Sequence, residues 1–266
     1  MPTARSLTLP LAFACSALLS STADANERHF TYTYESAVLP IGAREIEVWT
    51  TPRIGREDYF VAFDERLEFE VGLTDRLMTA FYLNWSAVSA DVEPDVRESD
   101  TEFTGVSSEW KLKLMDPVAD AVGLAVYGEL SGGTDEAELE GKLIIDKQVG
   151  DLLLAGNLVL ANEWELEPEE TETEQEIDIL LAAAWFLRPG LSAGLELRNH
   201  NAIVEGELEH SALFFGPVLG YATDAWWAAI TVLPQLPALE KEGDGSRVLD
   251  GHEKLEARIL FSFHLD

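Results

Sequence analysis

The stretch Val61–Leu73, VAFDERLEFEVGL, decides the fold, because apolar and polar side chains alternate along it. Its odd positions carry valine, phenylalanine or leucine with one exception, Glu65, and its even positions carry small or charged residues. Successive side chains of a β-strand point to opposite faces of the sheet. The stretch therefore predicts a strand with one apolar face and one charged face.

The same alternation recurs along the chain and predicts twelve strands, separated by short turns on one side and by mostly longer, acidic connections on the other. The most acidic connections are 91–102 and 163–178. Short turns at one end and long loops at the other are typical of transmembrane barrels. The predicted strands are 43–51, 59–73, 77–89, 102–115, 121–131, 137–148, 152–164, 176–187, 191–202, 210–222, 225–234 and 253–265.

A lipid environment explains where the charges fall better than a soluble β-sandwich does. Six basic residues lie in the middle of predicted strands, and all six fall on the polar face: Arg66, Lys111, Lys113, Lys142, Arg198 and Arg258. A basic side chain facing the middle of a bilayer costs ~2–4 kcal/mol. Glu65 departs from this rule, so we expect it to lie above the lipid or to mark a β-bulge. The predicted fold is all-β: a transmembrane antiparallel up-and-down β-barrel of about twelve strands.

The first 25 residues have the order of features of a signal peptide. Arg5 precedes the apolar run Leu7–Leu19, and the small residues Ala23 and Ala25 offer a cleavage site. The one cysteine, Cys15, lies inside this segment, so cleavage after Ala25 leaves no thiol chemistry. We expect residues 1–25 to be a signal peptide and residues 26–266 to form a single barrel domain in the bacterial outer membrane.

The charge balance limits the partners. The chain has 18 lysines and arginines against 49 aspartates and glutamates, a formal net charge of −31. Nucleic-acid binding needs a basic surface, so nucleic acid is excluded as a partner. The expected partners are outer-membrane lipid and lipopolysaccharide, the outer-membrane assembly machinery, and small solutes.

The charged faces of the strands predict the lining of the barrel. By parity, twelve acids and six bases face the lumen: Glu45, Glu47, Asp64, Arg66, Glu68, Glu70, Glu109, Lys111, Lys113, Glu129, Glu138, Glu140, Lys142, Asp146, Glu196, Arg198, Glu256 and Arg258. An excess of acids favours cations in a pore. The alternative is that acids and bases pair across neighbouring strands and fill a narrow barrel. The segments 179–187 and 225–233 are apolar on both faces and are expected to line a non-polar part of the lumen.

Two segments carry family resemblances. The C-terminal run Phe261–Leu265 resembles the terminal strand that the outer-membrane assembly machinery recognises, although the chain ends in Leu265-Asp266 and not in an aromatic residue. The runs Tyr32–Pro40 and Glu47–Thr51, with Gly42 between them, resemble a group of uncharacterised proteobacterial outer-membrane proteins. The resemblance implies no known activity.

Sequence motifs for catalysis or metal binding are weak. His210-Ser211 is the one adjacent pair of the kind found in outer-membrane phospholipases, but in that family the serine follows the histidine by two positions and precedes Asn-Gly. The five histidines show no short metal-binding spacing, and Glu242–Ser246 lacks the ligand pattern of a calcium loop. We therefore predict no catalytic residue, no metal site and no cofactor.

The function expected from these features is a passive channel for small cationic or neutral solutes. One alternative is a closed structural or surface-interaction barrel, whose acidic loops bind divalent cations or lipopolysaccharide. A membrane-embedded hydrolase is the other alternative.

Overall fold

The computed structural model describes residues 27–93, 96–134, 136–166, 171–204, 206–241 and 246–265. The predicted signal peptide lies outside these residues. Within them the chain forms twelve strands. Their bounds are β1 (Arg44–Ile54), β2 (Phe60–Gly72), β3 (Leu77–Glu93), β4 (Val96–Met115), β5 (Gly123–Gly132), β6 (Glu136–Val149), β7 (Leu152–Leu166), β8 (Thr171–Arg188), β9 (Leu191–Val204), β10 (Glu207–Ala222), β11 (Trp226–Glu240) and β12 (Leu255–Leu265).

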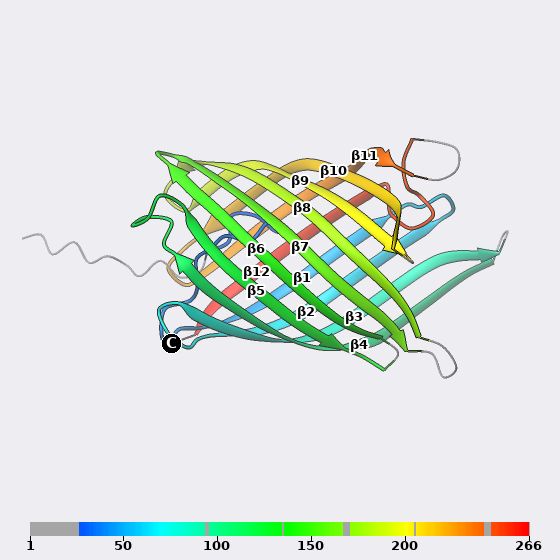
Figure 1. Cartoon of the computed structure of the whole chain (residues 1–266), viewed down its shortest axis with the longest axis horizontal. Helices are drawn as coiled ribbons and strands as arrows, with labels where there is room; N and C mark the ends of the chain where they lie inside the picture. Colours follow the sequence, from blue (N-terminus) through cyan, green and yellow to red (C-terminus); the bar gives the residue numbers. More distant parts are fainter. Residues whose placement is uncertain are drawn as a thin grey trace, which may run out of the picture.

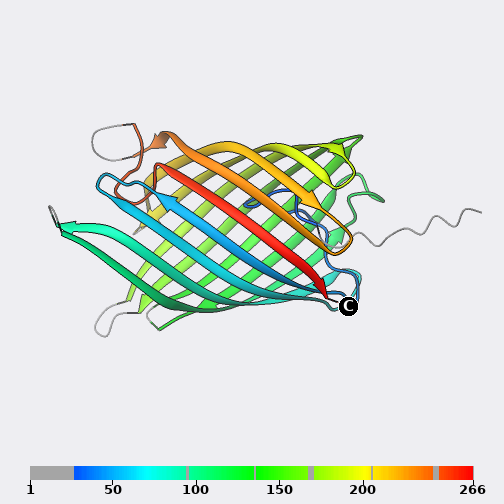
Figure 2. The ribbon, with the colours of Figure 1, turned by 180° about the vertical axis from the view of Figure 1, so that it is seen from behind.

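The strands form one closed antiparallel barrel in which each strand pairs with its neighbours in the chain (Figures 1 and 2). The barrel closes because β1 pairs on one side with β2 and on the other with β12, where Arg44 lies opposite Val71 and Leu265. The predicted fold class and strand number are confirmed. Among the described residues, no helix has the length and apolar character needed to cross a membrane.

The two ends of the barrel differ. At one end, called the closed end below, lie the start of β1, the end of β12 and five short turns such as 73–76 and 189–190. At the other end, called the open mouth, β3 and β4 project together beyond the remaining strands (Figure 1). The long β11–β12 connection also lies at the open mouth.

The predicted long acidic loops are wrong in their secondary structure, because much of 91–102 and 163–178 is strand. β3 and β4 stay paired as far as Glu93 and Val96, and β7 and β8 as far as Leu166 and Thr171. Polar side chains support the β3–β4 extension, since Arg97 forms a 2.8 Å ion pair with Asp91. Sequence periodicity misses these extensions because both of their faces are polar.

The outer face of the barrel carries the apolar side chains. Leu67, Phe81 and Leu83 keep between 40% and 52% of their surface exposed in the isolated chain. Glu65 also lies on this outer side, where its carboxylate accepts a 2.8 Å hydrogen bond from Thr50 Oγ1. The pairing of β2 runs past Glu65 without a shift in register, so Glu65 does not mark a bulge in β2.

Candidate functional site

The lumen is occupied by the chain's own N-terminal segment. Residues 27–40, called the plug below, form a loop inside the barrel before β1 begins (Figures 1 and 2). The two arms of this loop are tied together by His29, whose Nδ1 and backbone N–H lie 3.0 Å and 3.1 Å from Glu35 Oε1. The plug side chains Phe30, Thr31 and Leu39 are completely buried. The plug is therefore part of the packed interior of the barrel.

Side chains of the wall hold the plug backbone, and Glu196 and Asn157 make most of these hydrogen bonds. The carboxylate of Glu196 on β9 accepts hydrogen bonds from the backbone N–H groups of Thr31, Tyr32 and Thr33, at 3.1, 3.0 and 2.8 Å. Asn157 on β7 pairs with Tyr34 in the manner of a neighbouring strand, accepting from its N–H at 2.7 Å and donating to its carbonyl oxygen at 2.9 Å. A carboxylate that accepts several backbone hydrogen bonds makes charge-assisted contacts, which are stronger than neutral ones. Glu196 is thus the principal anchor of the plug.

Aromatic side chains of the plug fill apolar recesses in the wall. Phe30 packs against a group of alanine, valine and leucine side chains that includes Ala182 and Ala184 of β8. Tyr32 packs against Phe214 and Leu233, the latter on β11. This packing explains why 179–187 and 225–233 are apolar on both faces: one face meets lipid and the other meets the plug.

Basic side chains of the wall lie over the plug tyrosines. Lys142 Nζ is 4.1 Å from the centre of the Tyr34 ring, and the Arg258 guanidinium is 4.1 Å from the centre of the Tyr32 ring. Arg28 of the plug stacks on Tyr34 at 4.0 Å. Cation–π contacts of this kind stabilise the most where water is excluded. They add to the hydrogen bonds that hold the plug.

Five glutamates surround the lower part of the lumen, between the plug and the closed end. Each of them is at most 4% exposed: Glu45, Glu47, Glu68, Glu70 and Glu109. Indole groups and hydroxyls supply part of their hydrogen bonds, since Trp49 donates to Glu47 at 3.0 Å and Trp227 donates to Glu45 at 3.1 Å. These five side chains are packed into the interior of the barrel in its lower half.

The upper half of the lumen is a polar vestibule that opens at the mouth. It consists of two adjoining cavities of about 580 and 800 Å³, which share Arg53, Asp64 and Arg198 among their lining residues. Tyr32 and Tyr34 of the plug line the inner cavity and close it from below. The charged lining of the inner face contains more acids than bases: Asp64, Glu102, Glu129, Glu136, Glu138, Glu140, Glu163, Glu174, Glu176, Asp178, Glu209, Asp250, Glu253 and Glu256 against Arg53, Arg56, Arg66, Lys142, Arg198, Lys241 and Arg258.

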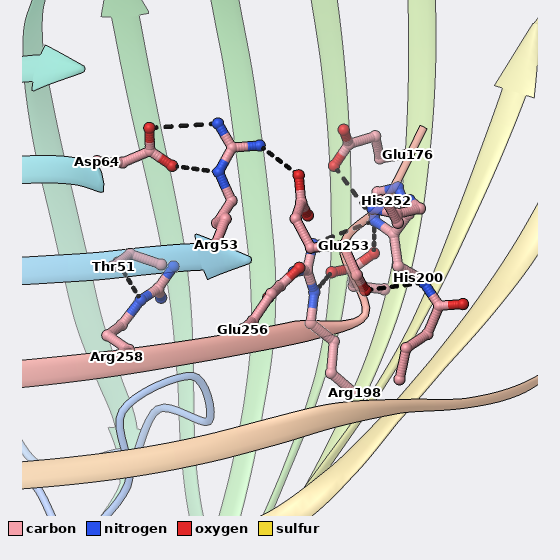
Figure 3. A network of polar contacts seen from close by, with 12 residues as sticks. Thr51, Arg53, Asp64, Glu176, Arg198, His200, His252, Glu253, Glu256 and Arg258 are labelled. Atoms are coloured by element: carbon pink, nitrogen blue, oxygen red, sulfur yellow. Dashed lines mark hydrogen bonds and ion pairs between the residues drawn. The ribbon is translucent and has the colours of Figure 1, made fainter. Parts of the chain in front are cut away.

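Ion pairs cross the vestibule wall (Figure 3). Arg53 lies 2.7 Å from Asp64 and 3.1 Å from Glu253, and Arg198 lies 2.9 Å from Asp178 and 3.0 Å from Glu256. Arg53–Asp64 and Arg198–Asp178 join consecutive strands, β1 with β2 and β8 with β9. Arg53–Glu253 and Arg198–Glu256 join residues 200 and 58 positions apart in the sequence.

The residues predicted to face the lumen occupy three different places. Glu45, Glu47, Glu68, Glu70, Glu109 and Lys111 lie in the tightly packed lower half, and Glu196 anchors the plug. Asp64, Arg66, Glu129, Glu138, Glu140, Lys142, Arg198, Glu256 and Arg258 line the vestibule. Lys113 lies at the closed end, where its ammonium group contacts Asp116 in the next turn at 3.2 Å, and Asp146 lies beside the start of β5, near Gly123 and Ser36.

Pairing across neighbouring strands, the second of the two expectations, describes only part of this lining. Arg198 on β9 pairs in this way with Asp178 on β8. Arg66 on β2 instead lies 3.3 Å from Glu129 on β5, and Lys142 lies 2.8 Å from Glu140 of its own strand. The packed glutamates of the lower half do not follow that scheme. Sequence parity could place them on the inner face, but it could not show that the plug covers them.

Sequence reasoning also missed a group of histidines at the open mouth. His200, His210 and His252 come together there, although they are separated in the sequence. Burial next to other basic side chains lowers the pKa of His252, which keeps its imidazole neutral. His210 and Ser211 lie on opposite faces of β10: His210 lies 2.9 Å from His252, and Ser211 bonds Asn199 and Asn201. That arrangement gives the adjacent pair no shared site.

The fold defines the class of protein. Three solved structures are similar over most of the chain: the NanC porin (TM-score 0.55, 12% identity, 83% of this chain and 100% of that chain), the translocator domain of the autotransporter NalP from Neisseria meningitidis (0.51, 10%, 84% and 88%) and the β domain of the Bordetella autotransporter BrkA (0.50, 9%, 85% and 100%). At these identities the likeness shows the fold alone, which is that of an outer-membrane β-barrel.

The sequence places the chain more narrowly. Residues 22–265 match the model of a family of unknown function, DUF6662, and the chain belongs to this family. No curated protein matches the chain in sequence. The expected membership of an uncharacterised outer-membrane barrel family is confirmed.

Proposed function

We propose that this barrel is a channel for small cationic solutes that its own N-terminal segment keeps closed, with the open mouth facing the outside of the cell. The observation that carries this proposal is the position of the plug between an acidic vestibule and the closed end. The proposal refines the expected passive channel, because permeation then requires the plug to move. It assigns no catalytic step to the protein.

The charge of the vestibule supports the choice of cations. Acids exceed bases along its lining, and the ion pairs of Arg53 and Arg198 already neutralise two of the bases. A pore lined by acids concentrates cations and repels anions. Charges inside a narrow lumen are also less screened than exposed charges, for which the Debye length is ~8 Å at physiological salt.

The anchoring of the plug supports a gate, since few wall side chains form hydrogen bonds with its backbone. Two wall side chains, Glu196 and Asn157, make the hydrogen bonds to its backbone that are described above. The alternative, a permanently closed structural barrel with an acidic outer rim, predicts that release of the plug never gives a conducting state.

Reversal potentials in planar bilayers test the proposal. We expect a variant that lacks residues 27–39 to conduct and, in a KCl gradient, to reverse near the potassium equilibrium potential. Replacing Glu138 and Glu176 with glutamine in that background should reduce the cation preference, whereas Glu98→Gln on the projecting β4 extension should leave it unchanged. Anion preference would reject the electrostatic argument. A correctly folded deletion variant that does not conduct would favour the structural barrel.

A further inference from the structure

Three histidines from different segments meet at the open mouth. His200 lies near the end of β9, His210 near the start of β10, and His252 in the connection between β11 and β12. The distances between ring centres are 4.6 Å for His200–His252, 4.9 Å for His210–His252 and 5.8 Å for His200–His210. Each ring offers a nitrogen atom within 4.8 Å of a nitrogen of the other two. All three line the outer cavity of the vestibule.

The spacing of the ring nitrogens fits one shared metal ion. The Nε2 atoms of His210 and His252 are 2.9 Å apart. Two imidazoles bound tetrahedrally at ~2.0–2.1 Å from a zinc ion hold their nitrogens about 3.3 Å apart. A side-chain rotation that opens the pair by a few tenths of an ångström is therefore enough to admit an ion.

A carboxylate fixes the orientation of the third ring. His200 Nδ1 lies 2.8 Å from Asp178 Oδ1, closer than its 3.3 Å contact with an Arg198 nitrogen. Asp178 is itself held by Arg198 Nε at 2.9 Å. A carboxylate that accepts the Nδ1–H of a histidine leaves the Nε2 lone pair to coordinate a metal, and such an outer partner is common around metal-bound histidines. Figure 3 shows His200, His252 and Arg198 next to one another in this network.

We propose that His200, His210 and His252 bind one divalent transition-metal ion of the zinc type, with water in the remaining position. Glu176 Oε2 is 3.7 Å from His200 Nδ1, and Glu174 also brings an oxygen close to this histidine. Imidazole ligands suit zinc, copper and nickel, whereas calcium and magnesium prefer oxygen ligands. The site therefore discriminates between divalent ions, which an acidic rim alone does not.

The charges around the histidines favour a bound cation. Arg198 lies 3.3 Å from His200, and its guanidinium is engaged by Asp178 and Glu256. The carboxylates of Glu174 and Glu176 lie beside His200. The ion would sit on the wall of the vestibule, beside the path of the solutes in the proposed channel.

Zinc binding to the untagged, folded protein in detergent tests the proposal. We expect titration calorimetry to show one Zn²⁺ bound per chain, with Ca²⁺ and Mg²⁺ in tenfold excess unable to displace it. His210→Ala and His252→Ala should each weaken binding at least tenfold, and Asp178→Asn, which changes the positioning partner of His200, should weaken it less. His264→Ala, at the closed end, is the matched control and should bind zinc as the unaltered protein does.

Cobalt gives a second readout that does not depend on affinity. Co²⁺ bound by three imidazoles in a tetrahedral site should produce visible absorption bands, and these should disappear in the His252→Ala variant. Retention of zinc affinity and of the cobalt spectrum after all three histidines are replaced would overturn the proposal, as would displacement of zinc by calcium. No zinc binding by the unaltered protein would also overturn it and would leave the histidines as a packed cluster next to Phe214. Neither readout uses conductance, so the result is independent of the proposed channel.

Discussion

The Glu196→Ala substitution tests whether hydrogen bonds to this side chain hold the plug in the lumen. In the barrel, three buried backbone N–H groups of the plug donate to this one carboxylate. Its removal leaves those donors without the acceptor, and a buried unsatisfied donor costs about 1–3 kcal/mol. Even at the lower bound, the plugged state loses about 3 kcal/mol. Because about 1.4 kcal/mol corresponds to a factor of ten in an equilibrium constant, the released state should become about 100-fold more populated.

Single-channel recording measures this change directly. We expect the Glu196→Ala protein to open about two orders of magnitude more often than the unaltered protein, at an equal single-channel conductance. Asn84→Ala is the control, since Asn84 bonds Ser107 within the wall at 2.9 Å and makes no hydrogen bond to the plug among the described residues. Equal opening frequencies for the Glu196 variant, the control and the unaltered protein would refute the role of Glu196 as an anchor.

Further predictions follow from packing around the plug and from the facing of the strands. Phe30→Ala removes a fully buried ring and should raise the opening frequency as well, because truncating a buried phenylalanine costs about 3–5 kcal/mol. Gly72→Ala should lower the thermal stability measured by heat-dependent gel mobility, since its new Cβ would overlap backbone carbonyl oxygens of the plug; Gly128→Ala, whose Cβ finds space, should not. Leu83→Arg should reduce folding into vesicles far more than Asn84→Arg, because an arginine facing the bilayer core costs ~2–4 kcal/mol; equal folding yields would mean that the facing is wrong.

The fold could be predicted from the sequence because its strongest constraint is local. The alternation at Val61–Leu73, and its repeats along the chain, shows for each segment separately that it is a strand and which side chains share a face. Basic side chains are unfavourable on the face that meets lipid. The register of the strands follows from the short turns. The extensions around Asp91 and Glu174 could not be predicted in the same way, because strand pairing beyond the membrane needs no apolar face.

The candidate site could be predicted only in part. Parity placed Glu196 on the inner face, but its role depends on a segment 163–165 residues earlier in the chain. Aromatic residues alternate along the run Phe30–Tyr34, which is typical of a strand or of buried packing. Neither this pattern nor the family resemblance shows that the segment lies inside the lumen. The histidines show no motif because they lie on β9, on β10 and in the β11–β12 connection, and His210 and His252 are 42 residues apart in the sequence.

Hydrogen exchange at the plug backbone tests the central claim, that the N-terminal segment is held inside the lumen. The amides of Thr31, Tyr32, Thr33 and Tyr34 donate to buried wall side chains, so they should exchange as slowly as the paired amides of β1. Slow exchange at all four amides in the folded barrel is the result that the structure predicts. Exchange of these amides within seconds, at the rate of an unstructured peptide, would show that the segment does not close the barrel.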